Sequence, residues 1–150
     1  MANLPQQGQP LPEIDLTAEN GSRVGPGDLA GQKTVLYFYP KDDTPGCTKE
    51  ACAFRDRMSD YREADIQVYG VSLDPPESHR EFREKYNLNF PLLTDRDGRA
   101  AEALGILRDN GEVANRVTFL LAPDGNIAKV YPEVTPETHA DEILQDANSL

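Results

Sequence analysis

The chain has 150 residues, 38% of them hydrophobic and 27% charged, which is enough for one soluble domain over residues 1–150 that folds without disulfides. Its 26 acidic residues outnumber its 15 basic ones and give a formal net charge of -11, which disfavours nucleic acid and anionic membranes as partners. The first residues lack a signal-peptide pattern and no apolar stretch reaches membrane-spanning length, so we expect a cytoplasmic protein.

The first half of the chain predicts a loose start followed by a buried strand. Residues 1–10 are polar and are expected to be loose, and Ile14, Leu16 and the turn-rich stretch 19–32 indicate a small hairpin or irregular lead-in. The run KTVLYFY at 33–39 is almost continuously apolar, which is typical of a central strand buried on both faces. Pro40 ends this strand.

A helix opens directly after this strand and carries both cysteines of the chain. Thr44 is the expected N-cap, Pro45 takes the first helical position and Cys47 lies in the first turn. An apolar stripe with helical spacing faces the core and contains Cys47, Ala51, Phe54, Met58 and Tyr61. Cys47 is therefore expected to point inward at the mouth of a pocket, while Cys52 lies off the stripe, on the polar side.

The second half of the chain predicts alternating strands and helices. Asp74 is the expected N-cap of a helix that has Pro75 at its first position and ends near Tyr86, and 95–98 reads as a turn rather than a calcium loop. The other elements are strands at 66–73 and 90–93, a short helix at 98–104, a hairpin of strands 117–121 and 127–131, and a closing helix at 136–147. This order predicts an α/β sandwich with right-handed crossovers between its central strands.

The two cysteines are too far apart on a helix to form a disulfide. Residues five positions apart are roughly 8.6 Å apart between Cα atoms, whereas a disulfide needs less than about 7 Å. A Cys47–Cys52 disulfide therefore requires the first one or two turns of the helix to unwind. In a cytoplasmic protein, two nearby cysteines are more often catalytic, redox-active or metal-binding than structural.

Two plainer interpretations of the cysteines stay open at this point. They could be small buried hydrophobic residues with no chemistry. They could also belong to a zinc site, but the only histidines, His79 and His139, fall in separate helices without paired spacing and read as surface or packing residues.

The run from Pro40 to Cys47, PKDDTPGC, matches the pattern P-x-x-x-[TS]-x-x-C of peroxiredoxins. Together with Cys52 in CTKEAC, the chain resembles the Q/BCP (bacterioferritin comigratory protein) branch of that family. The resemblance continues through SLDPPESHREFREKY, PLLTDRDG, RVTF and PDGNIAKVYPEVTPETHADEIL, and so covers nearly everything beyond the first ten residues. It implies a thioredoxin-like sandwich, with a mixed β-sheet flanked by helices and an N-terminal hairpin.

The resemblance also implies a reaction and its residues. The chain would reduce hydrogen peroxide and organic hydroperoxides without a metal or other cofactor, with Cys47 as the peroxidatic nucleophile, Cys52 as the resolving cysteine and thioredoxin, or a similar dithiol, as reductant. Arg116 would stabilise the thiolate and Thr44 would orient the peroxide. The pocket would include Pro40, Pro45 and Gly46, and Arg55 is a further candidate for orienting Arg116 or the pocket. Because both cysteines are in one chain, we expect a monomer.

Two other functions compete with a peroxidase. A thiol–disulfide oxidoreductase of the same fold normally uses C-x-x-C, and the wider spacing of Cys47 and Cys52 disfavours it. A redox-sensing or holdase-like binding protein would use the same thiols without turnover. Catalytic consumption of peroxide separates the peroxidase from both.

Overall fold

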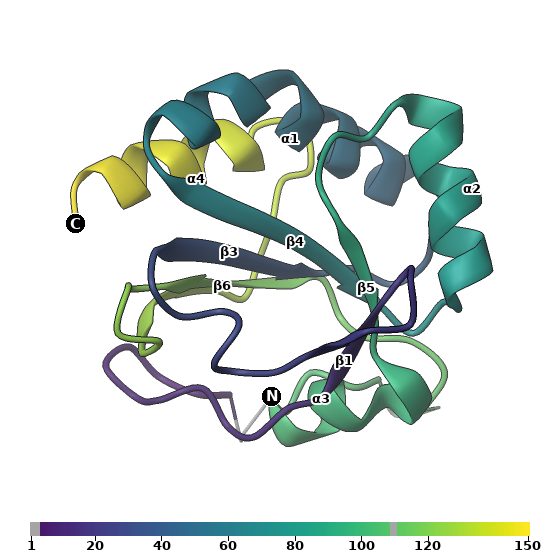
Figure 1. The fold of residues 1–150 in the computed structure, drawn as a ribbon, viewed down its shortest axis with the longest axis horizontal. Helices are drawn as coiled ribbons and strands as arrows, with labels where there is room; N and C mark the ends of the chain where they lie inside the picture. Colours follow the sequence, from purple (N-terminus) through teal and green to yellow (C-terminus); the bar gives the residue numbers. More distant parts are fainter. Residues whose placement is uncertain (1–3, 109–110) are drawn as a thin grey trace.

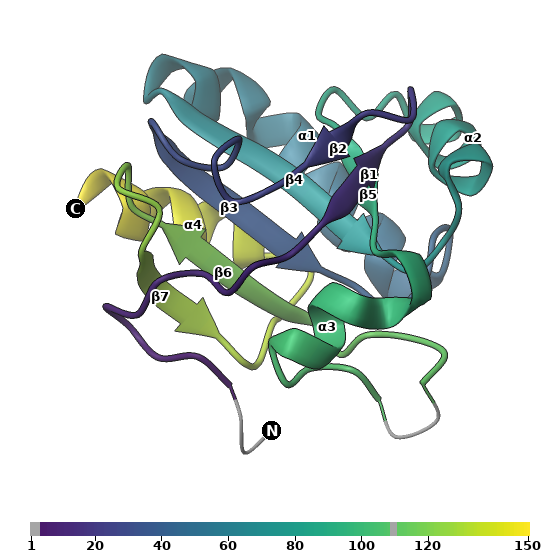
Figure 2. The ribbon, with the colours of Figure 1, turned by 60° about the horizontal axis from the view of Figure 1, so that its bottom comes forward.

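The centre of the molecule is a seven-stranded mixed sheet in the order β2-β1-β5-β4-β3-β6-β7. The computed structural model describes residues 4–108 and 111–150. The sheet is drawn in Figures 1 and 2. Its strands are β1 (Leu16–Ala18), β2 (Arg23–Val24), β3 (Lys33–Phe38), β4 (Ile66–Ser72), β5 (Leu92–Thr94), β6 (Val117–Leu121) and β7 (Ile127–Tyr131).

Strand β3 lies in the interior of the sheet, as expected for a strand whose side chains are mostly apolar on both faces. It pairs in parallel with β4 and antiparallel with β6, where Phe38 lies opposite Val117. Pro40 follows the strand and prevents its continuation, since proline has no N–H for the ladder. The backbone therefore leaves the sheet just before the segment that carries Thr44 and Cys47.

Helices cover both faces of the sheet. They are α1 (Pro45–Glu63), α2 (Pro76–Tyr86), α3 (Arg99–Ala103) and α4 (His139–Asn148). Figure 1 shows α1 and α4 side by side over one face, with α2 at the edge of the same layer. The short α3 and the segment before β1 lie over the opposite face (Figure 2). This arrangement confirms the predicted α/β sandwich.

The two faces of the sheet bury two separate hydrophobic cores. Alternation along β3 sends Val35 and Tyr37 into the core beneath α1, α2 and α4, and sends Leu36 and Phe38 into the core beneath α3 and the N-terminal segment. The first core also contains Cys47 and the predicted stripe of Ala51, Phe54, Met58 and Tyr61, all buried. The thiol of Cys47 therefore belongs to a packed aromatic interior.

Most predicted elements are present, with shifts at their ends. Strands β6 and β7 have the predicted bounds, and β1 and β2 form the N-terminal hairpin. The predicted cap of α2 is wrong by one residue: Pro75 is the N-cap and Pro76 takes the first position. Asp74 lies outside the helix because its carboxylate accepts hydrogen bonds from Ser72 and from the Asp42 amide instead.

The N-terminal segment differs in part from the loose start that we expected. Residues 1–3 lie outside the described residues. The amide of Gly8 donates to the carbonyl of Ile127, and the amide of Ile127 donates to Gln9, so this segment pairs with the beginning of β7. Across the described parts of the chain, no helix combines the length and apolarity that a bilayer crossing demands.

Candidate active site

The start of α1 holds four of the predicted site residues, Thr44, Pro45, Gly46 and Cys47. Thr44 is the N-cap, in extended backbone conformation, and Pro45 follows at the first position. The Thr44 side chain does not cap the helix; its hydroxyl donates to the carbonyl of Lys41 at 2.9 Å. The N–H groups of Gly46 and Cys47 precede the first helical hydrogen bond, from the Thr48 amide to Thr44. This turn therefore has amide donors that Thr44 does not occupy.

Cys47 lies beside a guanidinium group. Its side chain is 1% exposed and is not in a disulfide. Nη2 of Arg116 donates to the Cys47 sulfur at 3.2 Å. The forked geometry of arginine leaves further N–H groups beside this sulfur for a second acceptor.

Antiparallel pairing of β6 with β3 brings Arg116 to Cys47, although the two are far apart in sequence. Arg116 immediately precedes Val117, which lies opposite Phe38 at the end of β3, and α1 begins soon after that end. Gly46 makes room for the guanidinium: a Cβ atom there would lie 3.0 Å from Nη2 of Arg116. The position next to Cys47 thus suits a residue without a side chain.

Glu50 is a site residue that the sequence interpretation missed. Nη1 of Arg116 donates to its Oε1 at 2.7 Å, and its side chain is fully buried. Glu50 lies three residues after Cys47 and four before Phe54, so it occupies a gap in the apolar stripe. That position is the signal that could have identified it, because a carboxylate on the core face of a helix needs a partner.

The charged groups of the site shift each other's pKa values. Burial raises the pKa of Glu50 to about 7, against the opposing effect of Arg116. Burial lowers the pKa of Arg116, but Glu50 and Cys47 outweigh it, so the pKa is raised overall and the guanidinium stays charged. Burial, and then Arg116, lower the pKa of the nearby His139 to about 4, which keeps this imidazole neutral at pH 7.

The raised pKa of Glu50 predicts a pH dependence of stability. Its folded-state pKa of about 7 lies above the ordinary glutamate pKa of 4.5, so folding favours the protonated form. Relative to a Glu50→Gln variant, the wild-type free energy of unfolding should fall by up to about 3 kcal/mol as the pH rises from 4.5 to 7, and stay level above that. Chemical denaturation of both proteins across this range measures the difference.

Glu137 provides a control of opposite sign. A hydrogen bond from its own backbone and one from Lys49 lower the pKa of this exposed carboxylate. Its contribution to stability is therefore lost only below about pH 4.5. A wild-type protein whose stability relative to Glu50→Gln does not change with pH would contradict the raised pKa of Glu50.

Cys52 lies outside the buried stripe, as predicted. It is half-buried and lines a groove of about 540 Å³ between α1 and α4. Two ion pairs cross this groove, Lys49 to Glu137 at 3.4 Å and Arg57 to Asp141 at 2.5 Å. Cys52 is also free, and α1 is continuous through both cysteines. The structure thus shows the two thiols on one intact helix.

The remaining candidates lie at different distances from this centre. Pro40 is half-buried at the end of β3, and Pro45 is exposed at the start of α1. Arg55 is not brought to Arg116: its Nη1 donates to the Tyr86 carbonyl and its Nε to Asp56. Arg55 therefore contacts the end of α2, whereas the residue of α1 whose side chain pairs with Arg116 is Glu50.

The fold, the two free thiols on α1 and the guanidinium beside one of them, Cys47, are those of a cysteine-based redox enzyme of the thioredoxin-like class. Residues 7–130 match the model of the AhpC/TSA family. Peroxiredoxin Bcp of Bacillus subtilis is 40% identical over 149 residues, covering 95% of each chain. The chain therefore belongs to the AhpC/TSA family and is a peroxiredoxin, an enzyme that reduces hydroperoxides at the expense of a thiol reductant.

Solved structures show the same likeness. The peroxidoxin BcpB of Mycobacterium tuberculosis superposes with a TM-score of 0.88 at 31% identity, covering 97% of both chains. The bacterioferritin comigratory protein of Xanthomonas campestris superposes with a TM-score of 0.85 at 30% identity, covering 97% of this chain and 96% of that one. These matches agree with the predicted thioredoxin-like sandwich.

Proposed function

We propose that Cys47 is the peroxidatic nucleophile, stabilised by Arg116, and that Cys52 resolves its oxidised form. The observation that carries this proposal is the hydrogen bond of 3.2 Å from Arg116 to a sulfur that is buried in the first turn of a helix. A thiol with a pKa near 8.5 gains at most roughly 30-fold from complete ionisation at neutral pH. Efficient catalysis therefore also needs donors that act on the peroxide as the O–O bond breaks.

The proposed reaction has three steps: oxidation of Cys47, resolution by Cys52 and reduction of the disulfide. The Cys47 thiolate attacks one oxygen of the hydroperoxide, the O–O bond breaks, and the leaving oxygen takes a proton to form water or an alcohol. Cys47 is then a sulfenic acid. The Cys52 thiol attacks that sulfur and releases water, which leaves a Cys47–Cys52 disulfide. An external dithiol reduces this disulfide and becomes oxidised itself.

The polar groups around Cys47 have separate roles in this proposal. Arg116 can hold the thiolate and a peroxide oxygen together, because its fork presents several N–H groups. The amides of Gly46 and Cys47 add donors at the helix start, where the helix dipole also favours negative charge. Thr44 supplies a hydroxyl oxygen that accepts a hydrogen bond from the hydroperoxide O–H group.

Resolution requires a change of conformation. The intact α1 keeps Cys47 in the core and Cys52 at the groove, at a helical separation that a disulfide cannot bridge. We therefore infer that the first turns of α1 unwind after oxidation. Because both cysteines are on the same helix, the cycle needs no second copy, and we propose that the monomer is competent.

The proposed substrates and reductant follow from chemistry and from a relative. The X. campestris structure was described in connection with alkyl peroxide reduction activity, which supports organic hydroperoxides, besides hydrogen peroxide, as substrates here. Thioredoxin is the proposed reductant, because a disulfide that forms in an unwound segment is accessible to an attacking dithiol.

A coupled assay tests the proposed function. Wild-type protein is mixed with thioredoxin, thioredoxin reductase and NADPH, and peroxide loss is followed for hydrogen peroxide and for cumene hydroperoxide. We expect catalytic loss of both peroxides in this mixture. In a separate assay without thioredoxin, with dithiothreitol as the electron donor, we expect the protein not to accelerate the reduction of insulin. Reduction of insulin without peroxide loss would instead indicate a thiol–disulfide oxidoreductase, and oxidation of the thiols without turnover would indicate a sensor or binding protein.

A further inference from the structure

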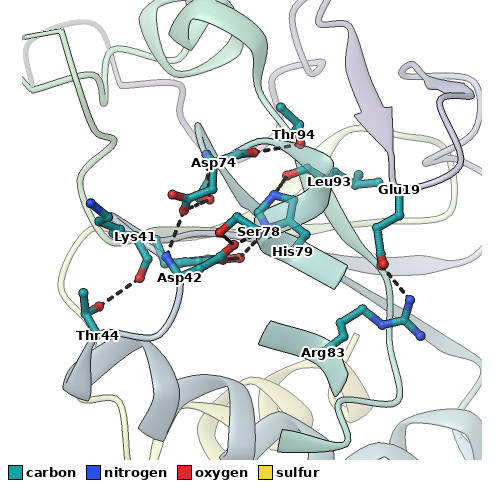
Figure 3. Close-up of polar contacts among 12 residues, drawn as sticks. Glu19, Lys41, Asp42, Thr44, Asp74, Ser78, His79, Arg83, Leu93 and Thr94 are labelled. Carbon is teal, nitrogen blue, oxygen red and sulfur yellow. Dashed lines mark hydrogen bonds and ion pairs between the residues drawn. The ribbon is translucent and has the colours of Figure 1, made fainter. Parts of the chain in front are cut away.

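One peptide group of the loop before α1 is held at both of its ends. The peptide between Lys41 and Asp42 has its carbonyl bonded to the Thr44 hydroxyl at 2.9 Å and its N–H bonded to Oδ2 of Asp74 at 2.8 Å. Figure 3 shows these two hydrogen bonds on opposite sides of the loop. Asp74 therefore fixes the orientation of the Lys41 carbonyl, which accepts the hydrogen bond from the Thr44 hydroxyl.

This orientation determines what the Thr44 hydroxyl can do. A hydroxyl has a single proton and two acceptor lone pairs. While the proton is donated to the Lys41 carbonyl, the Thr44 oxygen can only accept toward the active site. A hydrogen bond from the peptide N–H to a carboxylate also polarises the same peptide and strengthens its carbonyl as an acceptor.

Asp74 is itself held firmly by its neighbours. Its Oδ2 accepts a second hydrogen bond, from the Ser72 hydroxyl at 2.6 Å, and its amide donates back to the Ser72 oxygen at 3.2 Å. The Thr94 hydroxyl donates to the Asp74 carbonyl at 2.8 Å. Ser72 and Thr94 are the last residues of strands β4 and β5. The carboxyl ends of these two paired strands therefore determine where the Asp74 carboxylate lies.

The side chain of Asp42 fastens the same loop to α2. Its carboxylate is buried and accepts from the hydroxyls of Tyr39 at 2.5 Å and Ser78 at 2.7 Å. Its Oδ2 also lies 2.8 Å from Nδ1 of His79. His79 is fully buried and its Nε2 donates to the Leu93 carbonyl at 3.0 Å, since a carbonyl only accepts. The loop is thereby tied to the sheet through Asp74 and to the helix through Asp42 (Figure 3).

We propose that Asp74 is a positioning residue of the peroxidase reaction, which acts through the Lys41–Asp42 peptide to keep the Thr44 oxygen as a hydrogen-bond acceptor for the hydroperoxide. This inference rests on the proposed function, and in particular on the role of Thr44. Among the described residues, the hydrogen bonds of Asp74 go to Asp42, Ser72 and Thr94 and not to Cys47. Its effect on the site passes through the Lys41–Asp42 peptide. Loss of its carboxylate releases the peptide, and the Thr44 hydroxyl is then free to turn.

The test measures the rate at which hydrogen peroxide oxidises Cys47 in full-length variants. We expect Asp74→Ala to lower this rate about tenfold, because misplaced groups lose much of their effect on the transition state. In a Thr44→Val background, the same substitution should change the rate by less than about twofold, since the hydroxyl that it positions is gone. Alkylation of Cys47 by iodoacetamide, which needs no peroxide orientation, should also change by less than about twofold.

Two further variants separate positioning from general damage. Both donors to the Asp74 side chain converge on Oδ2, so Asp74→Asn can place its amide oxygen there and should restore oxidation to within about threefold of wild type. The matched control is Asp124→Ala. Oδ1 of Asp124 accepts from the backbone amide of Asn126 in the β6–β7 turn, away from the site, and its loss should leave oxidation unchanged.

The outcomes that overturn the proposal differ from those that overturn the proposed function. An Asp74→Ala protein that oxidises as fast as wild type, or that loses the same factor with and without the Thr44 hydroxyl, refutes the positioning role. Equal losses toward peroxide and iodoacetamide refute it as well. In each of these cases wild-type turnover of peroxide still stands. The proposed function fails instead if the wild-type protein leaves peroxide intact.

Discussion

Replacement of Cys47 by serine is expected to abolish peroxide consumption down to the uncatalysed background. A serine hydroxyl is not ionised near neutral pH, so neither the guanidinium of Arg116 nor the first-turn amides of α1 have an anion to stabilise. The measurement is peroxide loss in the coupled thioredoxin assay. Full activity in the Cys47→Ser protein would show that another group carries out the reaction.

The matched variant is Cys52→Ser, which removes the other thiol of the same helix. It should consume about one equivalent of peroxide per protein and then stop, because the sulfenic acid forms but has no partner. Trapping with dimedone and mass spectrometry of the peptide should place the adduct on Cys47. Sustained thioredoxin-linked turnover by this variant would contradict resolution by Cys52 and would leave the peroxidatic role of Cys47 intact.

Arg116→Met should slow the oxidation of Cys47 between about 10²- and 10³-fold. A cation at about 4 Å in an effective dielectric near 20 contributes about 4 kcal/mol, which is an upper value because the Arg116 side chain is 21% exposed. Methionine fills a similar length without charge. The second-order rate constant with hydrogen peroxide, obtained by competition against a reference peroxidase, measures the change.

The control for this substitution addresses Glu50. Loss of Arg116 leaves the buried carboxyl group of Glu50 without its hydrogen-bond partner, which by itself destabilises the site. The double variant with Arg116→Met and Glu50→Gln removes this titratable group, so it cannot become an unpaired buried charge, and should stay as slow as the single variant. Recovery of the wild-type rate in the double variant would mean that Arg116 only neutralises Glu50.

The sequence predicted those parts of the fold in which local pattern and tertiary environment agree. The run at 33–39 is apolar on both faces and became the interior strand β3, and the Pro123–Gly125 turn between alternating segments became the β6–β7 hairpin. The spacing of Cys47 and Phe54 along α1 identified its buried face. Helix ends were less predictable, because the carboxylate of Asp74 found backbone and side-chain donors outside the helix that it was expected to cap.

The site could be predicted only in part. Arg116 was assigned through the family resemblance, since its approach to Cys47 depends on the pairing of β6 with β3 and not on sequence distance. Arg55, on the same helix as Cys47, points to Tyr86. Glu50 was overlooked because charged residues on helices are usually solvated, and here Arg116 makes burial tolerable. The peptide bonded to Asp74 has no sequence signature, since any residue supplies the same backbone groups.

The pairing of the N-terminal segment with β7 has a consequence for the behaviour of the protein at high concentration. An open edge strand is a template on which a second chain can add a strand, which leads to aggregation. β7 is the outermost strand on its side, and the backbone bonds of Gly8 and Gln9 to Ile127 occupy part of its free edge. On the other side the sheet ends in β2, which has only two residues. Both edge strands of the sheet therefore offer little free backbone on which a second chain could add a strand.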